Sequence, residues 1–107
     1  DLEANGVGAI EIAARLTVSV ELSPRTARMV WPRIETPSHI GTLGCARPLE
    51  DAARIAFEQM IHWLEDEHGI PASEAYMLLG QIAEARCTQM VNPKYTFICK
   101  VAKRHLG

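Results

Sequence analysis

The 107-residue sequence lacks the features that define several large classes of protein. It has no apolar run near the ~20 residues that a membrane span requires. Its start, Asp1-Leu2-Glu3, has neither the basic residues nor the apolar stretch of a signal peptide. Lys and Arg total 11 against 13 for Asp and Glu, so no excess positive charge is available for nucleic acid. We therefore expect no membrane association and no nucleic-acid partner.

Cysteines are few, and their spacing fits neither a disulfide framework nor a zinc site. Cys45, Cys87 and Cys99 are odd in number, and no two of them form a CxxC pair. This pattern favours reduced thiols and a cytoplasmic location. Cys87 and Cys99 fall in apolar stretches, where we expect inert core residues. The sequence also lacks a P-loop, a GxSxG elbow, a Rossmann fingerprint and HExxH spacing.

The strongest pattern that is present is an alternation over residues 8–22, GAIEIAARLTVSVEL. Apolar side chains occupy its even positions from Ile10 to Leu22, and mostly polar ones occupy its odd positions. Because side chains alternate across a strand, the pattern predicts a long strand with one buried face. Shorter strands are expected over residues 27–31 and 39–44. The length of the first strand indicates a large sandwich or barrel sheet.

Residues 48–69 show helical periodicity instead, with apolar residues at spacings of three and four. Pro48 suits the first helical position and Gly69 suits the end. A second helix is predicted over residues 72–85, and two strands hinged at Asn92-Pro93 follow it. The predicted fold class is α+β: predominantly β, sandwich-like sheets with two amphipathic helices toward the C-terminus, as part of a larger fold.

Candidate functional side chains fall in three places. Asp1 and Glu3 alternate on an extended segment, where two carboxylates can share a metal ion or act as a base. Glu11 projects from a predicted strand, which is a rigid support for a site. Glu35 and His39 lie four residues apart in WPRIETPSHI, where an acid and an imidazole near a cation can bind an anion or orient a base. The ordinary alternatives are a solvated terminus, a solvent-facing strand and a surface loop with one salt bridge.

Four segments, in order, resemble the C-terminal part of the acetamidase/formamidase family. They are GAIE at 8–11, WPRIETP at 31–37, the helical stretch from 46 to 79 that ends in EAYMLL, and QMVNPKYT at 89–96. The resemblance covers nearly the whole chain. It implies hydrolysis of the C–N bond of short linear amides of the formamide and acetamide type, releasing ammonia and a carboxylate. It also implies a divalent metal ion, zinc or calcium, in several members.

The resemblance suggests roles for individual acidic residues. The family's Gly-Asp-Gly-Glu motif corresponds here to Asp1-Leu2-Glu3, with Leu2 in place of a glycine and the first glycine absent. Asp1 is then expected to contact the metal or the attacking water, and Glu3 to shuttle a proton to the leaving nitrogen. Glu11 is a further catalytic candidate. The family's Gly-Asp-x-His-Ala segment is not in this sequence, so most metal ligands are expected outside it.

The same resemblance places WPRIETP near the active-site face, where two prolines would hold polar groups still. Which of Arg33, Glu35 and His39 contacts the amide substrate stays open, with Glu35 and His39 as the two assigned candidates. We divide the chain into a β region over 1–46, a helical pair over 47–85 and a β hairpin over 86–107.

Three hypotheses remain open. In the first, the chain works with a missing N-terminal portion or a second chain as an amide hydrolase, in a homo-oligomer. In the second, it is a non-catalytic scaffold or oligomerisation fragment, because its apolar strand and helix faces need a partner surface. The third, a small-ligand or metal-binding protein unrelated to amidases, rests on Asp1, Glu3 and His39.

Overall fold

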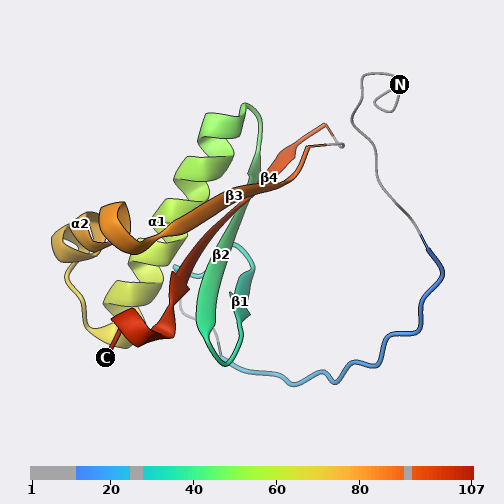
Figure 1. The fold of residues 1–107 in the computed structure, drawn as a ribbon, viewed down its shortest axis with the longest axis horizontal. Helices are drawn as coiled ribbons and strands as arrows, with labels where there is room; N and C mark the ends of the chain where they lie inside the picture. The colour runs from blue at the N-terminus through green and yellow to red at the C-terminus, as the bar shows by residue number, and fades with distance from the viewer. Residues whose placement is uncertain (1–11, 25–27, 91–92) are drawn as a thin grey trace.

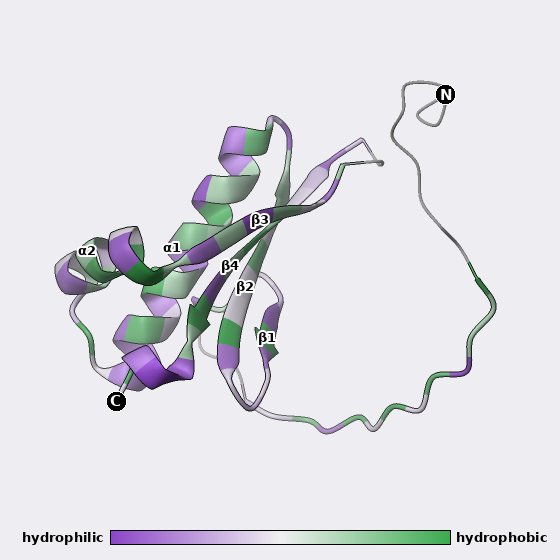
Figure 2. Cartoon of the chain, in the orientation of Figure 1, coloured by the Kyte–Doolittle hydropathy of each residue, from purple (hydrophilic) through white to green (hydrophobic). Residues whose placement is uncertain are grey.

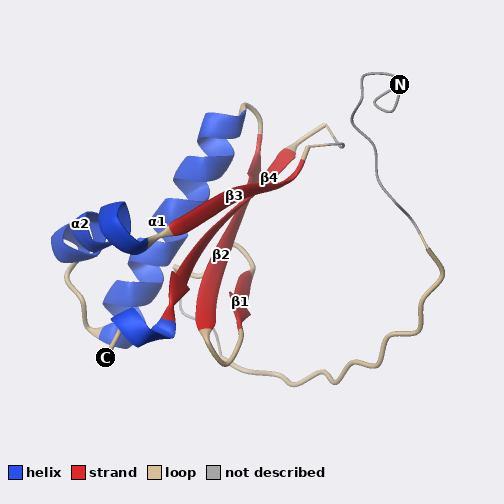
Figure 3. Cartoon of the chain, in the orientation of Figure 1, coloured by secondary structure: helices blue, strands red, loops and turns tan. Residues whose placement is uncertain are grey.

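The computed structural model describes residues 12–24, 28–90 and 93–107, and it shows a mixed α+β fold (Figure 1). Its elements are a four-stranded antiparallel sheet and two helices, α1 and α2, which lie on one side of that sheet (Figure 3). The described residues form one sheet, so the expected sandwich stays a prediction. No helix among them is long and apolar enough to cross a membrane.

The sheet is built around two long central strands. Its strands are β1 (Arg33–Glu35), β2 (His39–Ala46), β3 (Glu84–Gln89) and β4 (Tyr95–Ala102), in the spatial order β1-β2-β4-β3. β2 and β4 pair along their full length, from His39 opposite Ala102 to Ala46 opposite Tyr95. Because β3 pairs with β4 and not with β2, the two helices connect strands that are not neighbours. The predicted strands at 39–44 and on either side of Asn92-Pro93 are confirmed, although Asn92 itself lies outside the described residues.

Helix α1 (Leu49–His68) confirms the periodicity over 48–69. Pro48 is extended and lies one position before the helix, where its missing N–H removes no helical hydrogen bond. Gly69 ends the helix in the left-handed region at φ 65°, and its N–H donates to the carbonyl of Leu64. This is the conformation that glycine adopts without the steric cost of a Cβ.

Helix α2 (Ala72–Ile82) ends three residues before the predicted position 85. The chain needs those residues for β3, which begins at Glu84 and pairs there with Lys100. Since the strand hydrogen bonds replace the helical ones, the helix stops although Ala83 and Ala85 have good helix propensity. The prediction of a second helix is therefore correct in type, but it extends three residues too far.

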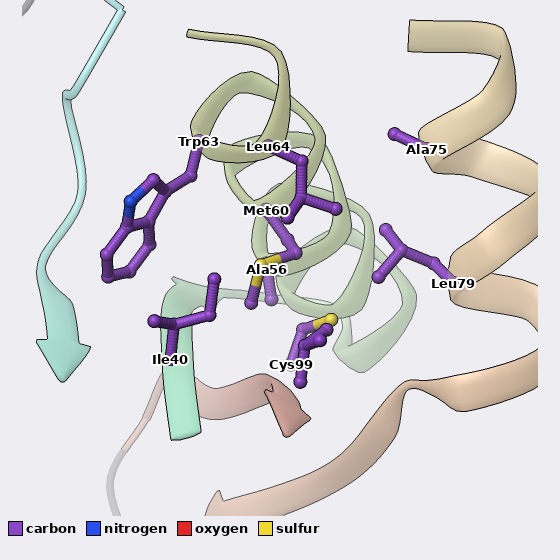
Figure 4. Packing of buried hydrophobic residues seen from close by; sticks show 9 residues of the cluster. Ile40, Ala56, Met60, Trp63, Leu64, Ala75, Leu79 and Cys99 are labelled. Atoms are coloured by element: carbon purple, nitrogen blue, oxygen red, sulfur yellow. The ribbon is translucent and has the colours of Figure 1, made fainter. Parts of the chain in front are cut away.

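The core lies between α1 and the central strands (Figure 4). Its largest fully buried side chains are Ile40, Thr42, Met60, Leu64, Cys99 and Val101. The hydroxyl of Thr42 donates to the carbonyl of Ala56 at 2.6 Å, which satisfies both polar groups across the helix–sheet interface. Burial raises the pKa of the Cys99 thiol to about 12, so this thiol stays neutral and inert, as predicted. Cys87 is only half-buried.

The prediction of a long strand over residues 8–22 is wrong for residues 12–22, the part of it that the structure describes. Residues 12–24 run without strand pairing (Figure 3), and their apolar side chains are exposed: Val18 by 70%, Val20 by 94% and Leu22 by 99%. Figure 2 shows hydrophobic and hydrophilic residues interleaved along this segment, so the alternation is present without a sheet. A strand needs hydrogen bonds from a neighbour, and no described residue supplies them here. Residues 8–11 lie outside the described residues.

The strand expected over 27–31 is also displaced. Residues 28–31 are not part of the sheet, and the edge strand β1 begins two residues later, at Arg33. Its register is set by the turn after Glu35, which places Glu35 opposite Ile40 and Arg33 opposite Thr42. The turn geometry decides which residues can pair, and this overrides the β propensity of Val30 and Trp31.

Candidate functional site

Three of the predicted site residues, Asp1, Glu3 and Glu11, lie outside the described residues, so their roles stay predictions. The other two, Glu35 and His39, lie on the two sides of the tight turn between β1 and β2. They do not act as a pair, because each binds a different partner from a distant part of the chain.

Hydrogen bonds hold the turn that carries Glu35 and His39 on both of its sides. The backbone N–H of Thr36 donates to the carbonyl of His39 at 2.9 Å, and the N–H of His39 donates to the hydroxyl of Thr36 at 3.0 Å. The N–H of Lys103 donates to the carbonyl of Ser38 at 2.8 Å. Pro37 restricts the backbone within the same turn. The stiffness expected from the sequence therefore comes from these hydrogen bonds as well as from proline.

His39 lies between a hydroxyl and a carboxylate. Its Nε2 is 3.1 Å from Oε2 of Glu84, the first residue of β3, and its Nδ1 is 2.8 Å from Oγ of Ser38. A carboxylate only accepts, so Nε2 donates to Glu84 and Nδ1 of the neutral ring accepts from the Ser38 hydroxyl, and the two bonds hold the imidazole in one orientation. The predicted acid–imidazole pair exists, but its acid is Glu84, 45 residues away in the sequence, and not Glu35.

Glu35 instead forms an ion pair with Lys103, whose Nζ is 2.7 Å from its carboxylate. The Glu35 side chain is 60% exposed, so the pair is screened by solvent and contributes at most about 1 kcal/mol to stability. The pair joins β1 to the short helix η2 (Lys103–His105) at the C-terminal end of the sheet. Glu35 thus remains available to a ligand on its exposed side.

Arg33 is the most unusual side chain of the WPRIETP segment, and the sequence suggested it only as the cation beside Glu35 and His39. Although charged, it is only 7% exposed. Its guanidinium carbon lies 4.8 Å from the centre of the Trp63 ring, which is a cation–π contact, and its Nη1 lies 3.5 Å from a carboxylate oxygen of Glu67. Its Nε and Nη2 are buried, and neither has a hydrogen-bond acceptor among the described residues.

A hollow of about 250 Å³ borders this arginine between β1, the end of α1 and the segment that leads into β1. We call it the Arg33 hollow. Its lining residues are Ser23, Pro24, Met29, Arg33, Glu35, Trp63 and Glu67. It gathers a buried cation, two carboxylates and an indole ring within one small space, which is the mixture of apolar wall and few polar groups found in small-molecule sites.

A second, larger hollow of about 500 Å³ lies between the two helices. Its lining residues are Arg54, Phe57, Glu58, Ile61, Tyr76, Leu79 and Gly80. The wall is mostly apolar, and its charged residues lie on the exposed side of α1. The Arg33 hollow is therefore the better candidate for a site that handles a small polar ligand.

The acidic end of α1 gives this side of the molecule its electrostatic character. Arg28 binds Glu65 and Asp66 there, each at 2.7 Å, and these hydrogen bonds, Asp66 first, raise the pKa of Arg28 above its ordinary value. Arg33 approaches Glu67 on the same turn of the helix. Carboxylates at the negative end of a helix dipole attract cations, so two arginines from the incoming segment are drawn to this end.

The described residues do not form a cluster of metal-ligating side chains. Among them, no three His, Cys, Asp or Glu side chains lie close enough together to hold a metal ion. Asp1, the one metal contact that the sequence suggested, lies outside this part of the chain.

The chain is similar to solved acetamidase structures. No protein-family model and no curated protein matches it. The acetamidase of Yersinia enterocolitica is 44% identical, with a TM-score of 0.72 over 74% of this chain and 24% of that one. The acetamidase of Bacillus halodurans is 28% identical, with a TM-score of 0.66 over 73% of this chain and 26% of that one.

A predicted acetamidase/formamidase from the thermophile Thermoanaerobacter tengcongensis shares the fold, with a TM-score of 0.63 and 20% identity. That match covers 69% of this chain and 25% of the other. The chain thus spans about a quarter of the length of each of these three structures.

Proposed function

Because the chain belongs to the acetamidase/formamidase family, we propose that it forms part of a hydrolase that cleaves the C–N bond of short linear amides. The observation that carries this proposal is the 44% identity to the Yersinia enterocolitica acetamidase over 74% of the chain. The resemblance of the four sequence segments is thereby confirmed at the level of the family. Since the chain spans 24% of that acetamidase, the activity is proposed for a longer or multi-chain enzyme to which these residues contribute.

The proposed reaction needs an activated water and a group that protonates the leaving nitrogen. We assign the proton shuttle to Glu3, with Asp1 near the attacking water and Glu11 as a further catalytic residue. Glu35 and His39 are proposed to bind substrate. The hydrogen bonds of His39 to Ser38 and Glu84 support its part, because an oriented imidazole can hold a substrate polar group or pass a proton.

A divalent metal ion, zinc or calcium, is part of the proposal only through Asp1 and residues outside this chain. The described residues contain no cluster that fits such an ion, so no step is assigned to it. The placement of this chain toward the C-terminal end of the enzyme, and the assembly into a homo-oligomer, are likewise proposals.

A second candidate function, a non-catalytic scaffold or oligomerisation segment of the same family, is favoured by one observation. Leu16, Val20 and Leu22 are at least 83% exposed, and adjacent apolar side chains of this kind call for a covering surface. This candidate predicts association with a partner chain or a second copy, without turnover of amides.

The test is to isolate the protein from its native source, measure its intact mass, and assay ammonia release from formamide and acetamide. The hydrolase proposal expects ammonia from at least one of the two amides, from a species heavier than 11.8 kDa or from a complex of several chains. A homogeneous preparation that releases no ammonia from either amide would refute the hydrolase and leave the scaffold.

A further inference from the structure

The starting point is the unmet hydrogen-bonding capacity of Arg33. A guanidinium has five N–H donors in a fixed fork, and among the described residues only Nη1 of Arg33 has a carboxylate partner, Glu67 at 3.5 Å. Nε and Nη2 form the other edge of the fork, are buried, and find no acceptor among the described residues. Burying a charged donor without an acceptor is costly, so the arrangement is complete only when something else supplies an oxygen.

The groups around Arg33 limit what that oxygen can belong to. The face of the guanidinium is covered by the ring of Trp63, so an acceptor must approach the edge. The Arg33 hollow borders this residue and also contains the carboxylates of Glu35 and Glu67. The charges of Arg33 and Lys103 balance those of the two glutamates, so these four described side chains carry no net charge. A free anion would meet two carboxylates, whereas an uncharged ligand with an acceptor and a donor would satisfy both kinds of group.

We propose that the Arg33 hollow binds the primary amide group of a short amide, with the carbonyl oxygen accepting from the guanidinium edge of Arg33 and the NH₂ donating to the carboxylate of Glu67. The short alkyl group then lies against the indole of Trp63. This assignment names recognition residues for the enzyme proposed above, and the choice of an amide rests on that proposed function. Arg33 and Glu67 are binding residues in it, because the covalent chemistry belongs to other groups.

The ligand reaches the guanidinium by movement of a side chain. Nε and Nη2 are covered, so a side chain that borders the Arg33 hollow must shift before a carbonyl oxygen can reach this edge. The carboxylate of Glu67 needs no such movement, because its side chain is 53% exposed.

The test measures acetamide binding to the full chain by two-dimensional NMR, using the indole N–H signals of the two tryptophans, Trp31 and Trp63. Acetamide should shift the Trp63 signal in a saturable way. Arg33→Lys keeps the charge and removes the fork, and it should weaken binding at least tenfold, which is about 1.4 kcal/mol. Glu67→Gln should weaken it severalfold, and its exposed position makes the variant safe for folding.

The matched control is Arg54→Lys, which alters an exposed Arg–carboxylate pair with Asp51 on α1 and should leave acetamide binding unchanged. Sodium acetate serves as the anionic probe and should bind at least tenfold more weakly than acetamide. The inference is overturned if wild type does not bind acetamide, if acetate binds more tightly, or if Glu67→Gln and a folded Arg33→Lys both bind like wild type.

The inference and the proposed function fail in different ways. Acetamide binding that depends on Arg33, in a protein that releases no ammonia from amides, would refute the hydrolase proposal and support amide binding in the Arg33 hollow. Ammonia release with unchanged KM and kcat in both Arg33→Lys and Glu67→Gln would support the hydrolase proposal and refute amide binding in the Arg33 hollow.

Discussion

Helix α1 and the segment over residues 12–24 both carry a regular pattern of apolar residues, yet only the helix forms the element that its pattern predicts. Along one face of α1 the apolar side chains are buried, with Ala56, Met60 and Leu64 at 0% exposure. Along 12–24 the apolar side chains remain exposed and no strand forms. The difference lies in the backbone: a helix satisfies its own N–H and C=O groups, whereas a strand needs a neighbour for every one.

This difference separates two questions about the protein. The sheet and helices hold the contacts that stabilise the fold, whereas the N-terminal part of the sequence, up to residue 24, contains the carboxylates predicted to perform the chemistry. We therefore expect substitutions in the first region to change the free energy of unfolding and substitutions in the second to change activity or association.

The largest effect is expected for Glu3→Gln in the intact enzyme. If Glu3 is the acid–base group, turnover of acetamide should fall by ~10²–10⁴-fold, because the amide side chain cannot carry the proton. The measurement is kcat for ammonia release, with thermal unfolding as the control for stability, which should not change. Near-wild-type turnover would remove Glu3 from the mechanism.

A similarly large effect, this time on stability, is expected for Leu64→Ala. Leu64 is fully buried between α1 and the sheet, so the variant should lose about 2–5 kcal/mol in the free energy of unfolding. Val20→Ala, in a side chain that is 94% exposed, should change it by less than about 0.5 kcal/mol. Urea unfolding of both variants gives the comparison. Equal losses would mean that the 12–24 segment packs against something in solution.

A smaller effect should distinguish two glycines in the body of the fold. A Cβ on Gly44 would collide with the carbonyl oxygen of Ala52 on α1, so Gly44→Ala should cost about 1–3 kcal/mol. A Cβ on Gly80 in α2 meets nothing within 4 Å, so Gly80→Ala should stabilise the helix by about 0.5–1 kcal/mol. Thermal unfolding of the two variants, measured under the same conditions, tests the predicted opposite changes in stability. No loss of stability in Gly44→Ala would contradict the described approach of α1 to β2, and a loss in Gly80→Ala would contradict the open space beside Gly80.

Much of the fold could be predicted from local patterns. Periodicity and turn residues predict the end of the first helix near Gly69 and the strand that begins at His39. They also predict the two strands around Asn92-Pro93. The start of β1 could not, because the turn from Thr36 to His39 sets its register through hydrogen bonds that no propensity encodes. The sandwich inferred from the length of the first pattern depended on a strand that does not form in the described residues.

The site was only partly predictable. The sequence singled out Glu35 and His39 because they are close together in WPRIETPSHI, but the structure gives them separate partners, Lys103 and Glu84. It also brings Arg33 onto Trp63, thirty residues further along the chain. No local pattern signalled this, because alternation over Arg33-Ile34-Glu35 would bury Ile34 and expose Arg33, whereas Ile34 is 42% exposed and the Arg33 side chain only 7%.

By itself, the sequence determined the identity and approximate bounds of the helices, the long β2–β4 strands and the membership of an amidase family, because these depend on contacts within a segment or on residues compared one by one. Only the tertiary structure decided which residues of the WPRIETP segment meet which partners. Those contacts join positions between 30 and 68 residues apart. Their pairing follows from the sheet order and from the direction in which α1 crosses it, and a linear pattern contains neither of these.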